Sequence, residues 1–146
     1  MKSFKLYRAI LFTSALVLSV AAGAQNPVNW TSGQLMEPSH LASLMAGNKP
    51  LPVIISVGPG AIIKNSIDIG SVKDGANLSK FQAQLATLPK DTAIVVYCGC
   101  CPYEHCPNVR PAIDVLKNMQ FTNYKLLDLP QNIKTDWIEK KYPVKD

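Results

Sequence analysis

Apolar runs alternate with amphipathic segments along this chain, and that alternation constrains its fold more than any other feature. Residues 53–57 and 93–97 form continuous runs rich in β-branched side chains, which are typical of strands buried on both faces. Residues 78–88 and 111–119 repeat apolar side chains at helical spacing. Strands that alternate with helices through short connectors predict right-handed crossovers and a parallel sheet with helices on both faces.

Four further segments complete the predicted domain. Residues 38–47 predict a short helix and residues 67–69 a short strand. Residues 124–129 predict the last strand and residues 133–142 the last helix. The cysteine-rich segment 98–106 directly follows the strongest strand, and in such sheets the reactive loop lies beyond the carboxyl end of a strand.

The first 24 residues predict a secretory signal peptide. Lys2, Lys5 and Arg8 precede an uninterrupted apolar stretch over residues 9–22, and small residues follow up to Ala24. The stretch is shorter than the roughly 20 residues that span a bilayer, which disfavours the alternative of a retained membrane anchor. We therefore expect cleavage after Ala24 and a periplasmic or secreted protein with no membrane span after cleavage.

The expected mature chain consists of a short lead-in, residues 25–33, and a single domain, residues 34–146. About 120 residues suit one hydrophobic core. The whole chain carries 15 Lys and Arg against 10 Asp and Glu, and without the three basic residues of the signal the balance is 12 against 10. So small an excess, spread over single lysines, provides no electrostatic surface for nucleic acid.

All four cysteines lie within nine residues, at positions 98, 100, 101 and 106. Disulfides that hold small secreted domains together usually join distant segments, so this clustering favours local chemistry. The cluster connects the strongest strand to an amphipathic helix. Amide groups at a helix start, together with the helix dipole, lower the pKa of a nearby thiol and favour the nucleophilic thiolate.

Arg110 is the one arginine of the expected mature chain, and it lies in the first turn of the helix after the cysteines. A fixed cation there would bind an anionic substrate; the alternative is an ion pair with a nearby carboxylate. The candidate catalytic residues are therefore Cys98 and Arg110. The candidate active-site loop consists of Gly99, Cys100, Cys101, His105, Cys106 and Asn108.

The order of these elements resembles a rhodanese domain. In that family a buried strand like residues 94–98 ends in the cysteine that carries a persulfide, and the next loop surrounds the sulfur with backbone amides. Residues 35–44 resemble the family's opening helix, residues 53–57 its first core strand, and residues 67–69 its short following strand.

The resemblance continues to the end of the chain. Residues 121–127 resemble the family's link into its last strand, and Trp137 and Pro143-Val144 resemble its closing tryptophan and Pro-Val ending. The resemblance implies an α/β, three-layer fold with a central, mainly parallel sheet of about five strands flanked by helices.

Three features depart from the family pattern. Ser56-Val57-Gly58 stands where the family usually has Asp-Val-Arg, and the usual Gly-His-Ile-Pro-Gly-Ala segment is not recognisable around residues 63–69. The loop after Cys98 is longer than the usual cradle by about four residues and holds three extra cysteines. Two polar supports of the ordinary site are therefore missing.

The resemblance implies a sulfurtransferase or sulfane-sulfur carrier. Cys98 would attack a donor such as thiosulfate or a polysulfide, hold the sulfur as a persulfide and pass it to an acceptor thiol. Arg110 and the loop amides would stabilise the negative charge. The implied partners are a small sulfur-containing substrate and a thiol acceptor, and no cofactor is implied.

Two alternative functions use the same cluster. Cys98 and Cys101 have the Cys-x-x-Cys spacing of an exchangeable disulfide, which indicates a thiol-disulfide redox module. Cys98, Cys100, Cys101 and Cys106, together with His105, are also soft ligands for zinc or copper(I).

Structural roles are open for several of these residues. Cys101 and Cys106 could form a disulfide that pins the long loop, with Pro102 and Pro107 stiffening it. This pairing is compatible with an active Cys98. His105 is either a base or a solvated side chain.

Overall fold

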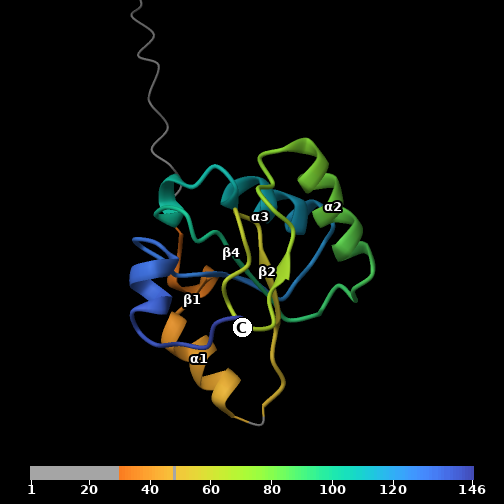
Figure 1. Ribbon diagram of the computed structural model, residues 1–146. Coiled ribbons are helices and arrows are strands. Elements are labelled where there is room, and N and C mark those ends of the chain that lie inside the picture. Colours follow the sequence, from red (N-terminus) through yellow and green to blue (C-terminus); the bar gives the residue numbers. More distant parts are fainter. Residues whose placement is uncertain (1–29, 48) are drawn as a thin grey trace, which may run out of the picture.

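The computed structural model describes residues 30–47 and 49–146, which form a five-stranded sheet with helices on both faces (Figure 1). The predicted signal peptide and most of the predicted lead-in fall on residues 1–29 and lie outside the described residues. No helix in the described ranges is long and apolar enough to cross a membrane. In chain order the elements are η1 (Ser32–Gln34), β1 (Leu35–Met36), α1 (Pro38–Ala46), β2 (Val53–Ser56), β3 (Ile67–Asp68), α2 (Gly75–Ala86), β4 (Ile94–Tyr97), η2 (Tyr103–His105), α3 (Val109–Asn118), β5 (Tyr124–Leu127) and η3 (Lys134–Ile138).

The strands are ordered β1-β5-β4-β2-β3, and all neighbouring strands are parallel. β4 lies at the centre, with Val95 aligned with Ile54 of β2 on one side and Lys125 of β5 on the other. The four residues of β4 are buried, as expected for a strand covered on both faces. The predicted parallel α/β sheet of five strands is confirmed.

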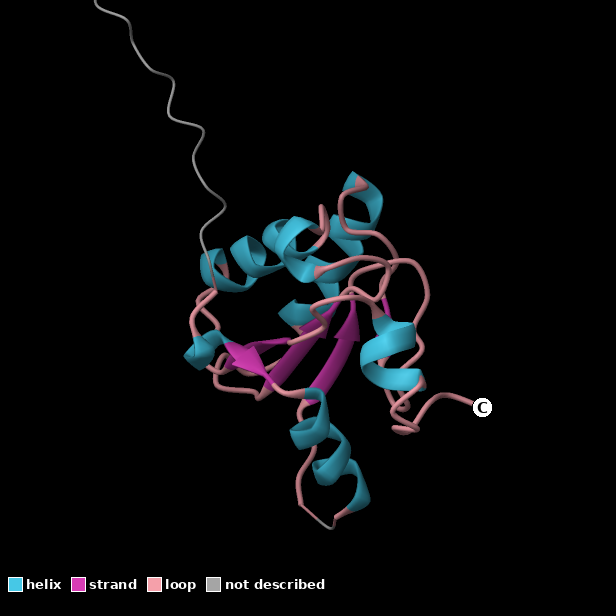
Figure 2. Cartoon of the chain, turned by 90° about the vertical axis from the view of Figure 1, so that its left-hand side faces the viewer, coloured by secondary structure: helices cyan, strands magenta, loops and turns pink. Residues whose placement is uncertain are grey.

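Helices lie on both sides of the sheet (Figure 2). Alternate side chains of the strands enter two separate hydrophobic clusters, one on each face. Ile94 and Val96 of β4 pack on the face covered by α2 and α3, whereas Val95 and Tyr97 pack on the face covered by α1 and Trp137. This two-residue period follows from the pleat of the strand. It also places the next residue, Cys98, on the same face as Val96 and α3.

Tyr97 links the end of β4 to the segment after β2. Its hydroxyl accepts hydrogen bonds from the backbone N–H groups of Ile62 and Ile63, at 3.0 and 3.2 Å, and lies 3.0 Å from the hydroxyl oxygen of Ser66. The Ser56 hydroxyl donates to the Gly60 carbonyl at 2.7 Å. These bonds hold the turn after β2 against the end of β4, where the cysteine loop begins.

Several predicted boundaries are corrected. The helix predicted over residues 38–47 is confirmed as α1, Pro38–Ala46. The resemblance placed the opening helix from residue 35, but Leu35 and Met36 pair with β5 as a two-residue edge strand. The last helix, expected over residues 133–142, is a short π-helix over Lys134–Ile138.

The two long helices α2 and α3, which cover the same face of the sheet, begin earlier than predicted. The helix expected from residue 78 begins at Gly75, and the one expected from residue 111 begins at Val109. Pro111 is tolerated in α3 because it lies in the first turn, where its missing N–H would have no helical partner. α3 therefore begins three residues after Cys106.

Candidate active site

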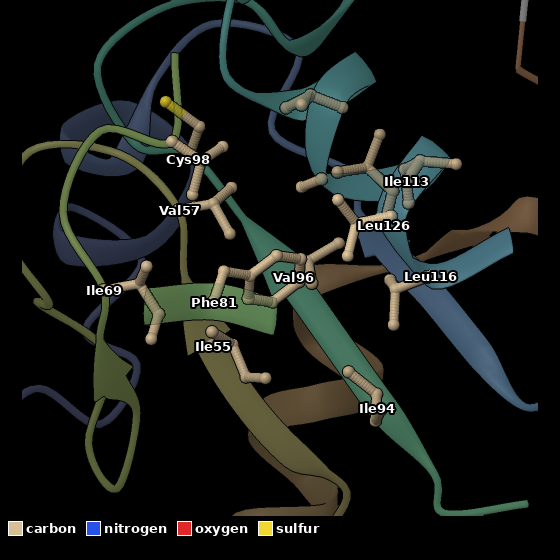
Figure 3. Packing of buried hydrophobic residues seen from close by; sticks show 14 of the residues in the cluster. Ile55, Val57, Ile69, Phe81, Ile94, Val96, Cys98, Ile113, Leu116 and Leu126 are labelled. Carbon is tan, nitrogen blue, oxygen red and sulfur yellow. The ribbon is translucent and has the colours of Figure 1, made fainter. Parts of the chain in front are cut away.

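The candidate site lies at the carboxyl end of β4, where Cys98 is the first residue after the strand. The Cys98 sulfur points away from the apolar side chains of the cluster and beyond Val57 (Figure 3). Cys98 is nevertheless 1% exposed. The sulfur is therefore buried, and the groups that it meets decide its chemistry.

The four sulfur atoms gather in one place, since the Sγ atoms of all four cysteines lie within 4.8 Å of one another. The Cys98 and Cys100 sulfurs are 3.3 Å apart, and those of Cys100 and Cys101 are 3.2 Å apart. Cys98 and Cys106 are buried, Cys101 is half-buried, and Cys100 is exposed. The cluster therefore extends from the interior to the surface.

Asn108 is the one polar side chain outside the cluster that contacts the Cys98 sulfur in the hydrogen bonds of the described residues. Its Nδ2 donates to Cys98 Sγ at 3.5 Å. Its Oδ1 accepts a hydrogen bond from the backbone N–H of Lys73 at 3.0 Å. Asn108 is only 2% exposed, so the Lys73 amide fixes which end of the side-chain amide faces the sulfur.

The hydrogen bonds around Cys98 favour its thiolate. Donation from the Cys106 thiol is the largest effect, and the Cys100 backbone amide, Asn108 and the Cys100 thiol add to it. Burial acts in the opposite direction because it disfavours the charged form. The balance lowers the pKa of Cys98 to about 5. Cys98 is therefore the thiolate of the cluster at neutral pH.

The neighbouring thiols show the opposite shift. Burial, together with hydrogen bonding to Cys101 and Cys98, raises the pKa of Cys100 to about 12. The hydrogen bond to Cys98 is the largest cause that raises the pKa of Cys106 well above its usual range, and burial adds to it. One negative charge is thus held by Cys98, while Cys100 and Cys106 retain their protons as donors.

Two glycines bring other segments close to the loop. A Cβ on Gly58 would lie 2.5 Å from Cys98 Sγ, and a Cβ on Gly99 would lie 2.6 Å from Cβ of Ile133. The Gly99 carbonyl also accepts a hydrogen bond from the Ile133 backbone N–H at 3.0 Å. At Gly58, where the resemblance leads one to expect arginine, the chain has a close backbone approach to the sulfur.

The side chains of Arg110 and His105, both predicted to belong to the site, make no hydrogen bond to a cysteine among the described residues. The Arg110 guanidinium carbon is 5.7 Å from the ring centroid of Trp30, a cation–π contact. The ion pair found among residues 30–47 and 49–146 joins Lys134 to Glu139, so Arg110 has no carboxylate partner there. His105 is exposed and ends η2. The catalytic role of Arg110 and the base role of His105 stay predictions.

The metal and disulfide alternatives also stay predictions. All four cysteines are free thiols, including Cys101 and Cys106. Tetrahedral zinc with zinc–sulfur bonds of about 2.3 Å separates its sulfur ligands by about 3.8 Å. The two sulfur–sulfur contacts, of 3.2 and 3.3 Å, are shorter than this.

Two cavities on the opposite side of β5 are separate from the sulfur cluster. One, of about 210 Å³, is lined by Glu37, Asp128 and Asp136 among others, and a second, of about 430 Å³, is lined by residues of β1 and by His40 and Lys125. No cysteine lines either cavity. The candidate site is therefore placed at the loop because of the chemistry of its thiols. The size of the cavities does not identify it.

Comparison with solved structures identifies the fold. The single-domain sulfurtransferase RDL2 of Saccharomyces cerevisiae superimposes with a TM-score of 0.52 over 76% of this chain and 94% of its own, at 14% sequence identity. This chain has a rhodanese-like fold. No protein-family model and no curated protein matches the sequence.

Two residues that shape the site in this rhodanese-like fold were not among the sequence predictions. Lys73 contributes only its backbone amide, which any residue type except proline would supply, so its side chain gave no signal. Gly58 was noted only as a departure from the family pattern. Its contact with Cys98 depends on the pairing of β2 with β4.

Proposed function

We propose that this protein is an exported sulfurtransferase or sulfane-sulfur carrier that holds a persulfide on Cys98. One observation carries the proposal: the Cys98 sulfur, buried at the end of the central strand, accepts a hydrogen bond from Asn108 Nδ2 at 3.5 Å and lies 3.3 Å from the Cys100 thiol. Donors arranged in this way stabilise a sulfur anion without having to reorganise during the reaction. The fold shared with a sulfurtransferase at low identity is consistent with this role.

The charging step is a displacement at a sulfane sulfur. The Cys98 thiolate attacks the outer sulfur of thiosulfate, forming a sulfur–sulfur bond, and sulfite leaves with the electron pair of the broken bond. The product is a Cys98 perthiolate, so three negative charges are present before and after the step. A polysulfide would charge Cys98 in the same way, with a shorter polysulfide as the leaving group.

Substitution of the nucleophile tests the proposal. Protein incubated with thiosulfate or a polysulfide should gain one sulfur atom on Cys98 and pass it to cyanide. Cys98→Ser should lower this activity about a thousandfold or more, because a serine hydroxyl is a far weaker nucleophile than a thiolate. Equal activity of the two proteins, with both folded by circular dichroism, would remove the assignment.

The same preparation tests the metal alternative. Zinc or copper bound in a 1:1 ratio to protein that was purified without a chelator, and that cannot be charged with sulfur, would favour the soft-metal module. Protein that is charged on Cys98 without bound metal would favour sulfur transfer.

We also propose that residues 1–24 are cleaved as a signal peptide during export. This proposal predicts a secreted or periplasmic protein whose first residue is Gln25.

A further inference from the structure

The cysteine cluster connects a buried sulfur to an exposed one. Cys98 is 1% exposed, whereas Cys100 is exposed and its sulfur lies 3.3 Å from that of Cys98. The reactants that approach so buried a sulfur directly must be small. The thiol of a folded protein cannot approach it in this way, because the backbone of that protein surrounds the thiol.

We propose that Cys100 is the delivery thiol of this site, taking the sulfane sulfur from Cys98 and passing it to the thiol of a protein acceptor. This inference rests on the proposed persulfide of Cys98. It extends that function by separating the cysteine that stores sulfur from the cysteine that delivers it.

The transfer between the two cysteines balances without any oxidant or reductant. The Cys100 sulfur attacks the outer sulfur of the Cys98 perthiolate, a new sulfur–sulfur bond forms on Cys100, and Cys98 leaves as a thiolate. The proton of the Cys100 thiol moves to the transferred sulfur. One negative charge is present before and after, and the persulfide is now on Cys100. An acceptor thiolate then takes the sulfur and the proton returns to Cys100.

Among the groups that contact the Cys98 sulfur, Cys100 is the one thiol that is exposed at the surface. Gly58 packs directly on the Cys98 sulfur, and Asn108 and Cys106 are themselves buried. Cys106 is 3% exposed and therefore has no better access to an acceptor than Cys98 has.

Comparing sulfur transfer to a large acceptor and to a small acceptor distinguishes the delivery step on Cys100 from the charging step on Cys98. The protein is charged with thiosulfate, and the sulfane sulfur is then offered to cyanide or to a folded protein that carries one accessible thiol. Cys100→Ser should slow transfer to the protein thiol about tenfold or more, with transfer to cyanide changed by no more than about threefold. In this variant the sulfur should accumulate on Cys98, as located by fragment mass spectrometry.

Cys101→Ser is the matched control. Cys101 is adjacent and its sulfur lies 3.2 Å from that of Cys100, but its sulfur has no hydrogen bond to Cys98. This variant should slow transfer to the protein thiol at least threefold less than Cys100→Ser does, because it retains the thiol that faces Cys98. An equal loss in both variants, or no loss in Cys100→Ser, would overturn the relay while leaving the Cys98 persulfide intact. If Cys98 is never charged in any variant, the proposed function and the relay are both wrong.

Discussion

The inner and the outer cysteines of the loop are the same residue type in opposite environments. The inner pair, Cys98 and Cys106, is buried, whereas the outer pair contains the exposed Cys100 and the half-buried Cys101. Cys98 and Cys100 are two positions apart in the sequence, yet the pKa is about 5 for Cys98 and about 12 for Cys100. The comparison shows that the donors around a thiol, more than its exposure, decide whether it carries the charge.

The largest expected effect is the separation of these ionisations. The ultraviolet absorbance of thiolate should rise through pH 5 by one thiolate per chain, because the pKa of Cys98 is lowered, and Cys100 should not contribute until strongly alkaline pH. Sulfur charging should be present above pH 5 and be lost as the pH falls through 5, where Cys98 becomes protonated. A Cys98→Ser variant that retained the acid step would assign it to another group.

The next effect tests the close approach of Gly58. Gly58→Ala would place a Cβ 2.5 Å from Cys98 Sγ, so the loop must move. We expect a loss of about 2 kcal/mol in the free energy of unfolding, together with slower charging of Cys98. Gly75→Ala is the matched control, since its Cβ would meet nothing within 4 Å at the start of α2, and it should change stability by less than about 0.5 kcal/mol. Equal stability of the two variants in urea would contradict the crowding.

A smaller effect is expected from Asn108→Asp. The aspartate would still accept the hydrogen bond from the Lys73 amide, but it would turn a carboxylate oxygen toward the Cys98 sulfur in place of Nδ2. Repulsion between like charges should raise the pKa of Cys98 by about one unit, which a charging rate measured from pH 4 to 8 would detect. Asn118→Asp, at the exposed end of α3, is the control. An unchanged midpoint in Asn108→Asp would show that Asn108 does not support the thiolate.

Much of the fold could be predicted because it depends on local patterns. The β-branched runs of β2 and β4 and the apolar faces of α2 and α3 each carry a period that identifies the element. β1 could not be predicted in this way. It has two residues and exists as a strand only because Leu35 and Met36 pair with Leu126 and Leu127 of β5, about 90 positions later.

The candidate site likewise has a part that local sequence patterns predicted and a part that depends on contacts between distant residues. The position of Cys98, directly after the most apolar strand and before an amphipathic helix, was visible in the sequence. Its partners were only partly visible. The anion-binding role predicted for Arg110 stays a prediction, whereas the contact of its guanidinium with Trp30 was not visible in the sequence. That contact joins residues 80 positions apart, and neither side chain alone indicates the other.

By itself the sequence determined the alternation of β2, α2, β4, α3 and β5 and the strand end that carries the cysteines, because hydrophobic periodicity and turn residues act over short distances. Only the tertiary structure decided which sulfur is buried, which is exposed and which is charged. Those properties depend on two contacts between distant segments. Gly58 contacts Cys98, 40 positions later in the sequence, and the Lys73 amide donates to Asn108, 35 positions later. The strength of a thiol acid is fixed by the groups packed around its sulfur, and packing brings those groups from distant parts of the chain.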